Sequence, residues 1–313
     1  MNFIETYGVP EAAIGVIDVF VSPEEKLLIE ALESREFTVE TARDALEKHT
    51  GRAWDLASVE NLVVKAYRKA VLELVDEDAQ TYRIGAFYSQ LDTFAVSQTN
   101  DFLYLPPEVR KALDEWCFSL YLGSLSKEEQ PTADKVLSLE ETLELIEATE
   151  HGIWLEPCDC RILAGKCDKP VEVCLSFTEG INTRRHRGLS KAVSKAEARE
   201  VVRAAHDAGL MHTANASGIC NCCSDCCYLF RAQKARGSLR AWPQATTVAS
   251  IDHDVCSRCG ACLKRCPFGA IRRERDRIVC DGSICRGCSV CVSKCPTSAI
   301  SMIAQKASRV APR

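Results

Sequence analysis

The sequence lacks the features that mark membrane proteins and nucleotide-dependent enzymes. No run approaches the roughly 18 apolar residues that a membrane helix needs, and Glu11 and Asp18 interrupt the apolar residues of the first segment. We find no targeting segment, and no G-x-G-x-x-G after a predicted strand, P-loop or H-E-x-x-H. We therefore expect a cytoplasmic protein with no membrane span and no flavin, nicotinamide or ATP site of its own.

Basic residues are scarce in the first half of the chain, and cysteine is almost absent there. Residues 1–150 contain 13 Lys and Arg against 30 Asp and Glu, a balance of −17, whereas residues 151–313 contain 26 against 14, a balance of +12. Of the 19 cysteines, only Cys117 lies in the acidic half. An odd number of cysteines in a reducing compartment disfavours a disulfide framework and favours metal or redox chemistry. The basic half either offsets the charge of anionic clusters or forms a docking patch.

Residues 1–122 contain no metal-ligand spacing and are predicted to form a winged-helix-like module. Ser22 and Pro23 mark a helix start, further helices are expected from Thr38 and from near Ser58, and a hairpin follows around residues 76–80. The helix predicted to contact DNA offers few basic residues in an acidic region, and DNA affinity depends on many phosphate contacts. We expect protein contacts or dimerisation, including a homodimer through this module, and no nucleic-acid binding.

A polar segment, residues 123–139, is predicted to be a linker, and residues 140–235 form a cysteine-rich module. We expect this module to be mostly helical, because helical patterns occupy ETLELIEATEHG and SKAEAREVVRAAHDAGL. Ser194 with Glu197 forms a capping box, and Gly209 suits the end of the second helix. The cysteines of ICNCCSDCC would then follow this helix closely.

Residues 250–303 contain an internal repeat that predicts two iron–sulfur clusters. CSRCGACLKRCPFGAI and CRGCSVCVSKCPTSAI share the spacing C-x2-C-x2-C-x3-C-P. In this spacing three cysteines hold one cluster and the fourth reaches the other cluster. The first predicted ligand set is Cys256, Cys259, Cys262 and Cys295, and the second is Cys285, Cys288, Cys291 and Cys266. Cys280 fits neither repeat, and we expect it to be a small buried residue.

These 50 or so residues resemble the 2[4Fe-4S] ferredoxins. The resemblance implies a pseudo-twofold α+β ferredoxin fold and one-electron transfer at low potential between two neighbouring [4Fe-4S] clusters. The chain as a whole is therefore predicted to be an α+β multidomain protein.

Nine further cysteines predict a third metal site in the cysteine-rich module, and the spacing leaves its nature open. A third iron–sulfur cluster is favoured because the donors are thiolates without accompanying aspartates; zinc and a redox-active or substrate-binding thiol pair are the alternatives. The set we favour is Cys160, Cys222, Cys223 and Cys226. The alternative ligands are Cys158, Cys167, Cys174, Cys220 and Cys227.

The module also resembles a family of anaerobe proteins described as 4Fe-4S binding proteins, whose function is not settled. The matching stretches are PCDCR, KCDKPVEVC, GLMH and ICNCCSDCC, with Lys166 in place of the usual Gly. His206 and His212 are candidate ligands, although surface or capping roles are favoured. Arg161 would donate to a cluster sulfide or form a surface salt bridge.

Taken together, these patterns predict an iron–sulfur electron-transfer protein that exchanges single electrons with a partner oxidoreductase. Two other functions remain open: a redox-sensing winged-helix regulator, and a catalytic reductase subunit whose substrate binds at the cysteine-rich site.

Overall fold

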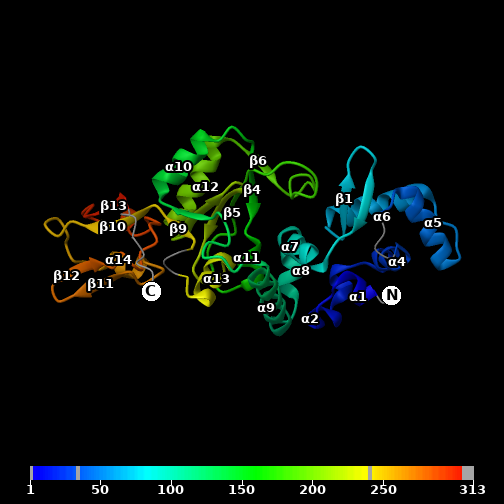
Figure 1. Cartoon of the computed structure of the whole chain (residues 1–313), viewed down its shortest axis with the longest axis horizontal. Coiled ribbons are helices and arrows are strands. Elements are labelled where there is room, and N and C mark those ends of the chain that lie inside the picture. The colour runs from blue at the N-terminus through cyan, green and yellow to red at the C-terminus, as the bar shows by residue number, and fades with distance from the viewer. Residues whose placement is uncertain (1–2, 33–35, 239–241, 305–313) are drawn as a thin grey trace. The chain divides into compact units, whose positions relative to one another are not determined.

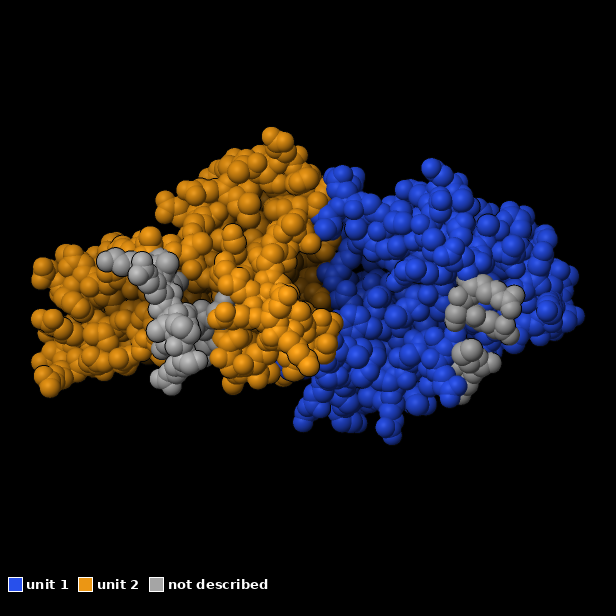
Figure 2. All heavy atoms as spheres, viewed as in Figure 1, with its two compact units in different colours: residues 1–120, 162–164, 178–190 blue, residues 121–161, 165–177, 191–313 orange. Residues whose placement is uncertain are grey.

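The computed structural model describes residues 3–32, 36–238 and 242–304 (Figure 1). The chain forms two compact units (Figure 2). The first contains residues 1–120, 162–164 and 178–190, and the second contains residues 121–161, 165–177 and 191–313. The ferredoxin region and most of the cysteine-rich module therefore belong to the second unit, whereas residues 162–164 and 178–190 of that module belong to the first. Among the described residues, no helix combines the length and apolar character needed to cross a membrane.

The first unit is built mainly from helices. Its described elements are α1 (Phe3–Tyr7), α2 (Glu11–Ile14), α3 (Ile17–Phe20), α4 (Pro23–Leu32), α5 (Val39–Thr50), α6 (Leu56–Arg68), α7 (Phe87–Ser97), α8 (Thr99–Tyr104) and most of α9 (Pro107–Ser124). The predicted start of the second helix is confirmed, because Thr38 caps α5 through the amide of Thr41. Asp55 caps α6 and so places its start slightly before Ser58.

A hairpin follows α6, as predicted. Strand β1 (Leu72–Asp76) pairs antiparallel with β2 (Thr81–Ile84), and Phe37 adds a backbone bridge to Tyr82. The loop at residues 178–190 packs on this hairpin: the Asn182 side chain pairs with both backbone groups of Leu74 at 2.8 and 2.9 Å, and Arg187 donates to the Leu72 carbonyl at 3.0 Å. From α4 onward the observed order is helix, helix, helix and hairpin, and α1, α2 and α3 precede it.

A seven-stranded sheet forms the centre of the second unit. Its strands are β3 (Lys135–Leu137), β4 (Ile153–Pro157), β5 (Glu172–Ser176), β6 (Lys191–Val193), β7 (Met211–Asn215), β8 (Gly218–Cys222) and β9 (Gln244–Ala245). They lie in the order β6-β4-β5-β8-β7-β3-β9, and all neighbours pair antiparallel except β3 and β9. The prediction of a mostly helical module is therefore wrong. The end of the predicted linker contributes strand β3.

The sheet explains where the second group of cysteines lies. The cysteines from Cys220 onward do not directly follow the helix that ends near Gly209, because the antiparallel strands β7 and β8 come next in the chain and β8 contains Cys220 and Cys222. Strands β7 and β8 contain cysteine, asparagine, histidine and glycine at most positions, so their sequence shows little of the apolar alternation by which strands are recognised.

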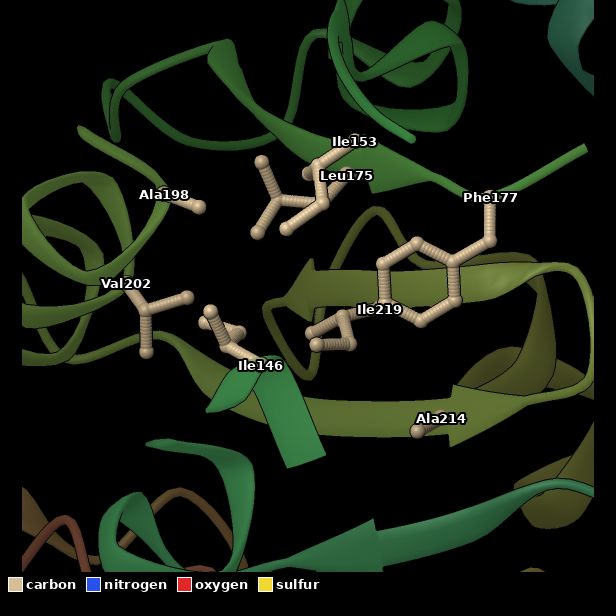
Figure 3. Close-up of a cluster of buried hydrophobic side chains, with 8 residues drawn as sticks. All are labelled: Ile146, Ile153, Leu175, Phe177, Ala198, Val202, Ala214 and Ile219. Carbon is tan, nitrogen blue, oxygen red and sulfur yellow. The ribbon is translucent and has the colours of Figure 1, made fainter. Parts of the chain in front are cut away.

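Helices α10 (Leu139–Ala148) and α12 (Lys195–Asp207) cover one face of the sheet (Figure 1). Both begin with a capping box, from Ser138 and Ser194. Between the helices and the sheet lies an aliphatic core that contains no cysteine (Figure 3). Its buried members are Ile146, Ile153, Leu175, Phe177, Ala198, Val202, Ala214 and Ile219.

The ferredoxin region consists of two small antiparallel ribbons and two short helical turns. Strand β10 (Thr247–Ile251) pairs with β13 (Ile300–Ala304), and β11 (Ile271–Glu274) pairs with β12 (Arg277–Cys280). Helix α14 (Ala261–Arg265) follows the first cysteine loop, and η1 (Val292–Lys294) follows the second. The apolar core of this region includes cysteines themselves: Cys262, Cys285 and Cys291 are buried within it.

Candidate metal centres

The first ferredoxin cavity is enclosed by the four cysteines of the first predicted set. Cys256, Cys259, Cys262 and Cys295 line one cavity. Three of these cysteines come from the loop before and into α14, and the fourth comes from the end of η1. Ile251, Ile278 and Ile300 make much of the remaining lining apolar, and Ser257 and Thr297 also line it.

The second cavity repeats this arrangement with the roles of the two loops exchanged. Cys285, Cys288 and Cys291 line this cavity together with Cys266, which ends α14. Two cavities, each lined by four thiols and mainly apolar side chains, fit two [4Fe-4S] clusters in donor chemistry. The structure thus brings together the members of both predicted ligand sets, including the crossed cysteines.

Backbone amides point at several of these sulfurs. The Ala249 amide donates to Cys285 Sγ at 3.5 Å, and the Ala299 amide donates to Cys295 Sγ at 3.2 Å. Such donors favour thiolate over thiol and tune the reduction potential of a bound cluster. The Cys280 thiol hydrogen-bonds Cys285 and lowers its pKa to about 6. Cys280 is only half-buried and is not among the residues lining either cavity.

Strand alternation sorts the side chains of the cysteine-rich module between the two faces of its sheet. Ile219 and Leu175 point into the aliphatic core beneath the helices. Because successive side chains of a strand point to opposite faces, Cys220, Cys222 and Cys174 project to the other face. The cysteines from the segments around α11 (Asp159–Ala164) and α13 (Tyr228–Arg236) join them there.

Three of the nine cysteines form a tight group, here called the three-thiol set: Cys167, Cys223 and Cys226. Cys167 Sγ lies 3.7 Å from Cys223 Sγ and 3.6 Å from Cys226 Sγ, and all three sulfurs lie within 4.8 Å of one another. Hydrogen bonding by the Cys226 thiol and by the Cys226 amide, at 3.3 Å, lowers the pKa of Cys223. The pKa of Cys226 is raised in turn, so the deprotonated partner is Cys223.

The other six cysteines, here called the six-thiol set, form a connected chain of sulfurs. Its members are Cys158, Cys160, Cys174, Cys220, Cys222 and Cys227. Hydrogen bonds link Cys158 to Cys174, Cys174 to Cys220 and Cys220 to Cys222, and Cys222 Sγ lies 3.2 Å from Cys227 Sγ. Neighbouring Cys158 and Cys227 act electrostatically on Cys160, whose pKa burial raises well above its usual value. Cys158, Cys222 and Cys227 are buried, whereas Cys220 is exposed. Six neighbouring thiols suit a cationic metal centre, which displaces the protons and offsets the thiolate charge.

Arg161 lies buried between the two sets. Its guanidinium donates to the Pro170 carbonyl at 2.6 Å and to the Asn221 carbonyl at 2.7 Å. Burial opposes its charge, but the sulfurs of Cys158 and Cys223 outweigh burial and raise its pKa. The expectation of a surface salt bridge is wrong, because the side chain is only 2% exposed and its polar contacts are carbonyls and sulfur.

His206 and His212 are buried on the helix-covered side of the sheet, and the surface role favoured for them is wrong. His206 Nδ1 lies 3.0 Å from His212 Nε2, and His212 Nδ1 lies 2.5 Å from Asn221 Oδ1. Burial lowers the pKa of both imidazoles to about 4, so both are neutral at neutral pH. Their hydrogen bonds fix Asn221 between Cys220 and Cys222 and leave neither histidine in contact with the three-thiol set.

The four cysteines favoured from the sequence divide between these groups. The structure places Cys223 and Cys226 with Cys167, and it places Cys160 and Cys222 in the six-thiol set. Cys167, in the segment before β5, was only an alternative in the sequence analysis. Assignment of these residues as ligands stays a prediction.

Comparison with known proteins identifies one part of the chain. The family model described as a 4Fe-4S binding domain matches residues 249–272. The chain therefore contains a 4Fe-4S binding domain and is an iron–sulfur protein with at least one 4Fe-4S cluster site. Searches of curated proteins and of solved structures each return no match.

Proposed function

We propose that this protein relays single low-potential electrons through two [4Fe-4S] clusters in its ferredoxin region, to or from a partner oxidoreductase. The observation that carries the proposal is the pair of similar cavities, each lined by three cysteines of one loop and one cysteine of the other. When bound there, each cluster supplies reversible one-electron redox chemistry.

The residues of this region have distinct roles in the proposal. The eight cysteines of the two predicted sets hold the clusters, and the aliphatic lining keeps water away from them. The amides of Ala249 and Ala299 stabilise the thiolates that they contact. Because each loop supplies a ligand to both cavities, the two centres are held in one rigid framework.

The exposed thiol of the first cavity indicates where a partner would approach. Cys259 is exposed, and its neighbour Arg258 accepts a hydrogen bond at its carbonyl from Arg273 at 2.9 Å. Arg275 and Arg277 belong to the same ribbon turn and are exposed. This concentration of positive charge favours a redox partner with an acidic surface.

We further propose that the six-thiol set supplies the ligands of a third iron–sulfur cluster. It includes Cys160 and Cys222 of the set favoured from the sequence. Thiols are the donors that iron–sulfur clusters use, and four of the six are enough for one cluster. Cys222 and Cys227, whose sulfurs lie 3.2 Å apart, therefore need not both be ligands. The cluster would extend the electron path or end it within the same compact unit.

Four single substitutions test the crossed ligand arrangement. Cys266→Ser and Cys285→Ser should each remove or alter the same cluster, whereas Cys256→Ser and Cys295→Ser should affect the other. Each variant should lose about four irons with matching sulfide, because one [4Fe-4S] cluster is lost. Electron paramagnetic resonance of the reduced proteins should therefore group the spectra in these pairs.

Cys280→Ser is the control for this series and should keep both clusters. Spectra of Cys266→Ser that match those of Cys256→Ser would contradict the crossed arrangement. Full retention of iron in all four variants would contradict the proposed function.

A redox-sensing regulator is the second candidate, favoured by the observed helix–helix–helix–hairpin order and the Phe37 bridge to Tyr82. This is the order of a winged helix. The −17 balance of residues 1–150 argues against DNA as its ligand and for protein contacts or dimerisation. Sequence-specific nanomolar DNA binding by the full chain at physiological salt would favour the regulator.

A further inference from the structure

The sulfurs of the three-thiol set are closer together than a cubane requires. A tetrahedral ion with metal–sulfur bonds of about 2.3 Å holds its ligand sulfurs about 3.8 Å apart. The separations from Cys167 to Cys223 and Cys226, 3.7 and 3.6 Å, agree with this edge length. In a cubane each thiolate binds a different iron, so its sulfurs stand farther apart.

The ferredoxin cavities provide an internal comparison. Among the described residues, Cys167, Cys223 and Cys226 form the one group of three or more potential ligand atoms within 4.8 Å of one another. In the described part of the chain, no three cysteines of either ferredoxin cavity have their sulfurs within 4.8 Å of one another. The three-thiol set is thus narrower than either ferredoxin cage.

The buried guanidinium of Arg161 beside Cys223 is a second observation about the three-thiol set. Its Nε is buried and has no hydrogen-bond partner in the described part of the chain, while the rest of its guanidinium contacts two carbonyls and Cys223. Three thiolates with one divalent ion carry a net negative charge. A buried guanidinium beside Cys223 balances that charge, which would otherwise be costly in a buried site.

We propose that Cys167, Cys223 and Cys226 bind a single thiophilic divalent ion of the zinc class, separate from any iron–sulfur cluster. All-sulfur donors in a tetrahedral arrangement select such an ion over magnesium or calcium. No fourth histidine, cysteine or carboxylate of the described residues joins the group, so an external ligand completes the coordination. The ion ties the segment before β5 to the turn after β8. The proposal deepens that of a metal-binding cysteine-rich module and is independent of the ferredoxin clusters.

The test counts zinc, iron and acid-labile sulfide per chain in the full-length protein purified anaerobically. Cys167→Ser is the chosen variant because Cys167 is the least buried of the three. It should remove one equivalent of a mononuclear ion and leave iron–sulfur iron and sulfide unchanged. Metal affinity should fall by more than the roughly 10- to 100-fold expected for the loss of an outer-shell partner. Cys117→Ser, which changes a buried cysteine of α9, should lose no metal.

A second measurement uses the wild-type protein, so its main result does not depend on the folding of a variant. Titration of zinc-depleted wild-type protein with Co²⁺ should give one equivalent with the absorption of tetrahedral thiolate cobalt, and Cys167→Ser should not give it. Loss of about four irons with sulfide in Cys167→Ser would overturn the proposal, as would absence of the cobalt absorption in the wild-type protein. Unchanged ferredoxin spectra in either case would leave the proposed electron relay intact.

Discussion

The two cysteine-rich regions of the second unit are built on different kinds of core. In the ferredoxin region the core contains Cys262, Cys285 and Cys291, and each cavity interrupts it. In the cysteine-rich module the core between the sheet and its two helices contains no cysteine, and strand alternation sends the thiols to the opposite face. The first region needs its cofactors to complete its interior, whereas the second has an interior of its own.

Removal of the metals should produce the largest difference between the two regions. After oxidation and chelation, strands β10 to β13 should lose amide protection completely, because a ribbon pair with empty cavities buries too little apolar area. Strand β5 and helix α12 should stay protected. Hydrogen exchange with mass spectrometry on the full chain measures both regions at once, and loss of protection in α12 together with β10 would show that the cores are not independent.

Two glycine substitutions sharpen the comparison at the level of the backbone. Gly218 has φ +152°, and an added Cβ would collide with the Leu175 carbonyl where β8 pairs with β5. We expect Gly218→Ala to lower the free energy of unfolding of the sheet by about 3 kcal/mol or more. Gly287 has φ +67°, and its Cβ would lie 2.5 Å from the Thr247 carbonyl oxygen.

Gly287→Ala should instead lower the iron content of the second ferredoxin cavity and leave the stability of the sheet unchanged. Anaerobic denaturant titration and iron analysis separate the two outcomes. Gly180→Ala, with φ +99° but open space around it, is the control for backbone strain without collision.

Loss of the Arg161 side chain should lower the free energy of unfolding nearly as much as Gly218→Ala. Substitution by methionine keeps much of its volume but removes the hydrogen bonds to the Pro170 and Asn221 carbonyls. Because hydrogen bonds from charged groups contribute about 1.5–3 kcal/mol each, we expect the loss of two to cost about 3 kcal/mol, the lower end of their sum, in anaerobic unfolding experiments. The cysteines of both thiol sets should also take up less metal. A variant as stable and as metal-rich as the wild type would show that Arg161 is not needed to balance the thiolates.

The smallest effect on stability is expected at a surface ion pair between the cysteine-rich module and the ferredoxin region. Lys294 Nζ lies 3.1 Å from Asp207, with both side chains largely exposed. Exposed ion pairs contribute about 0–1 kcal/mol, so Lys294→Ala should change stability by less than 1 kcal/mol. Arg265→Ala should cost more, because Arg265 donates to the carbonyls of His206 and Asp207 at 2.7 Å. If the two variants lost the same free energy of unfolding, the stabilisation would come from net charge and not from the hydrogen bonds of Arg265.

Short sequence patterns predicted the features that depend on neighbouring residues in the chain. Caps at Thr38 and Ser194 lie within one turn of the helices that they start, so short patterns were sufficient. The ferredoxin ligand sets were predicted from spacing, because three thiols within seven residues can reach one cavity with little freedom, and the structure gathers each predicted set around one cavity. The sheet of the cysteine-rich module was missed, because its order β6-β4-β5-β8-β7-β3-β9 depends on pairings between distant segments.

The sequence by itself determined the repeat, its cysteine spacing and the unequal distribution of charge. Tertiary structure alone decided how nine further cysteines divide into three and six. Cys222 and Cys223 are adjacent, yet they join different sets, because β8 ends at Cys222 and the chain then turns away from the sheet. Cys167 reaches Cys223 across 56 positions because the strands on either side of the sheet centre bring their flanking segments together. Which thiols lie together is a property of that sheet, and spacing along the chain does not contain it.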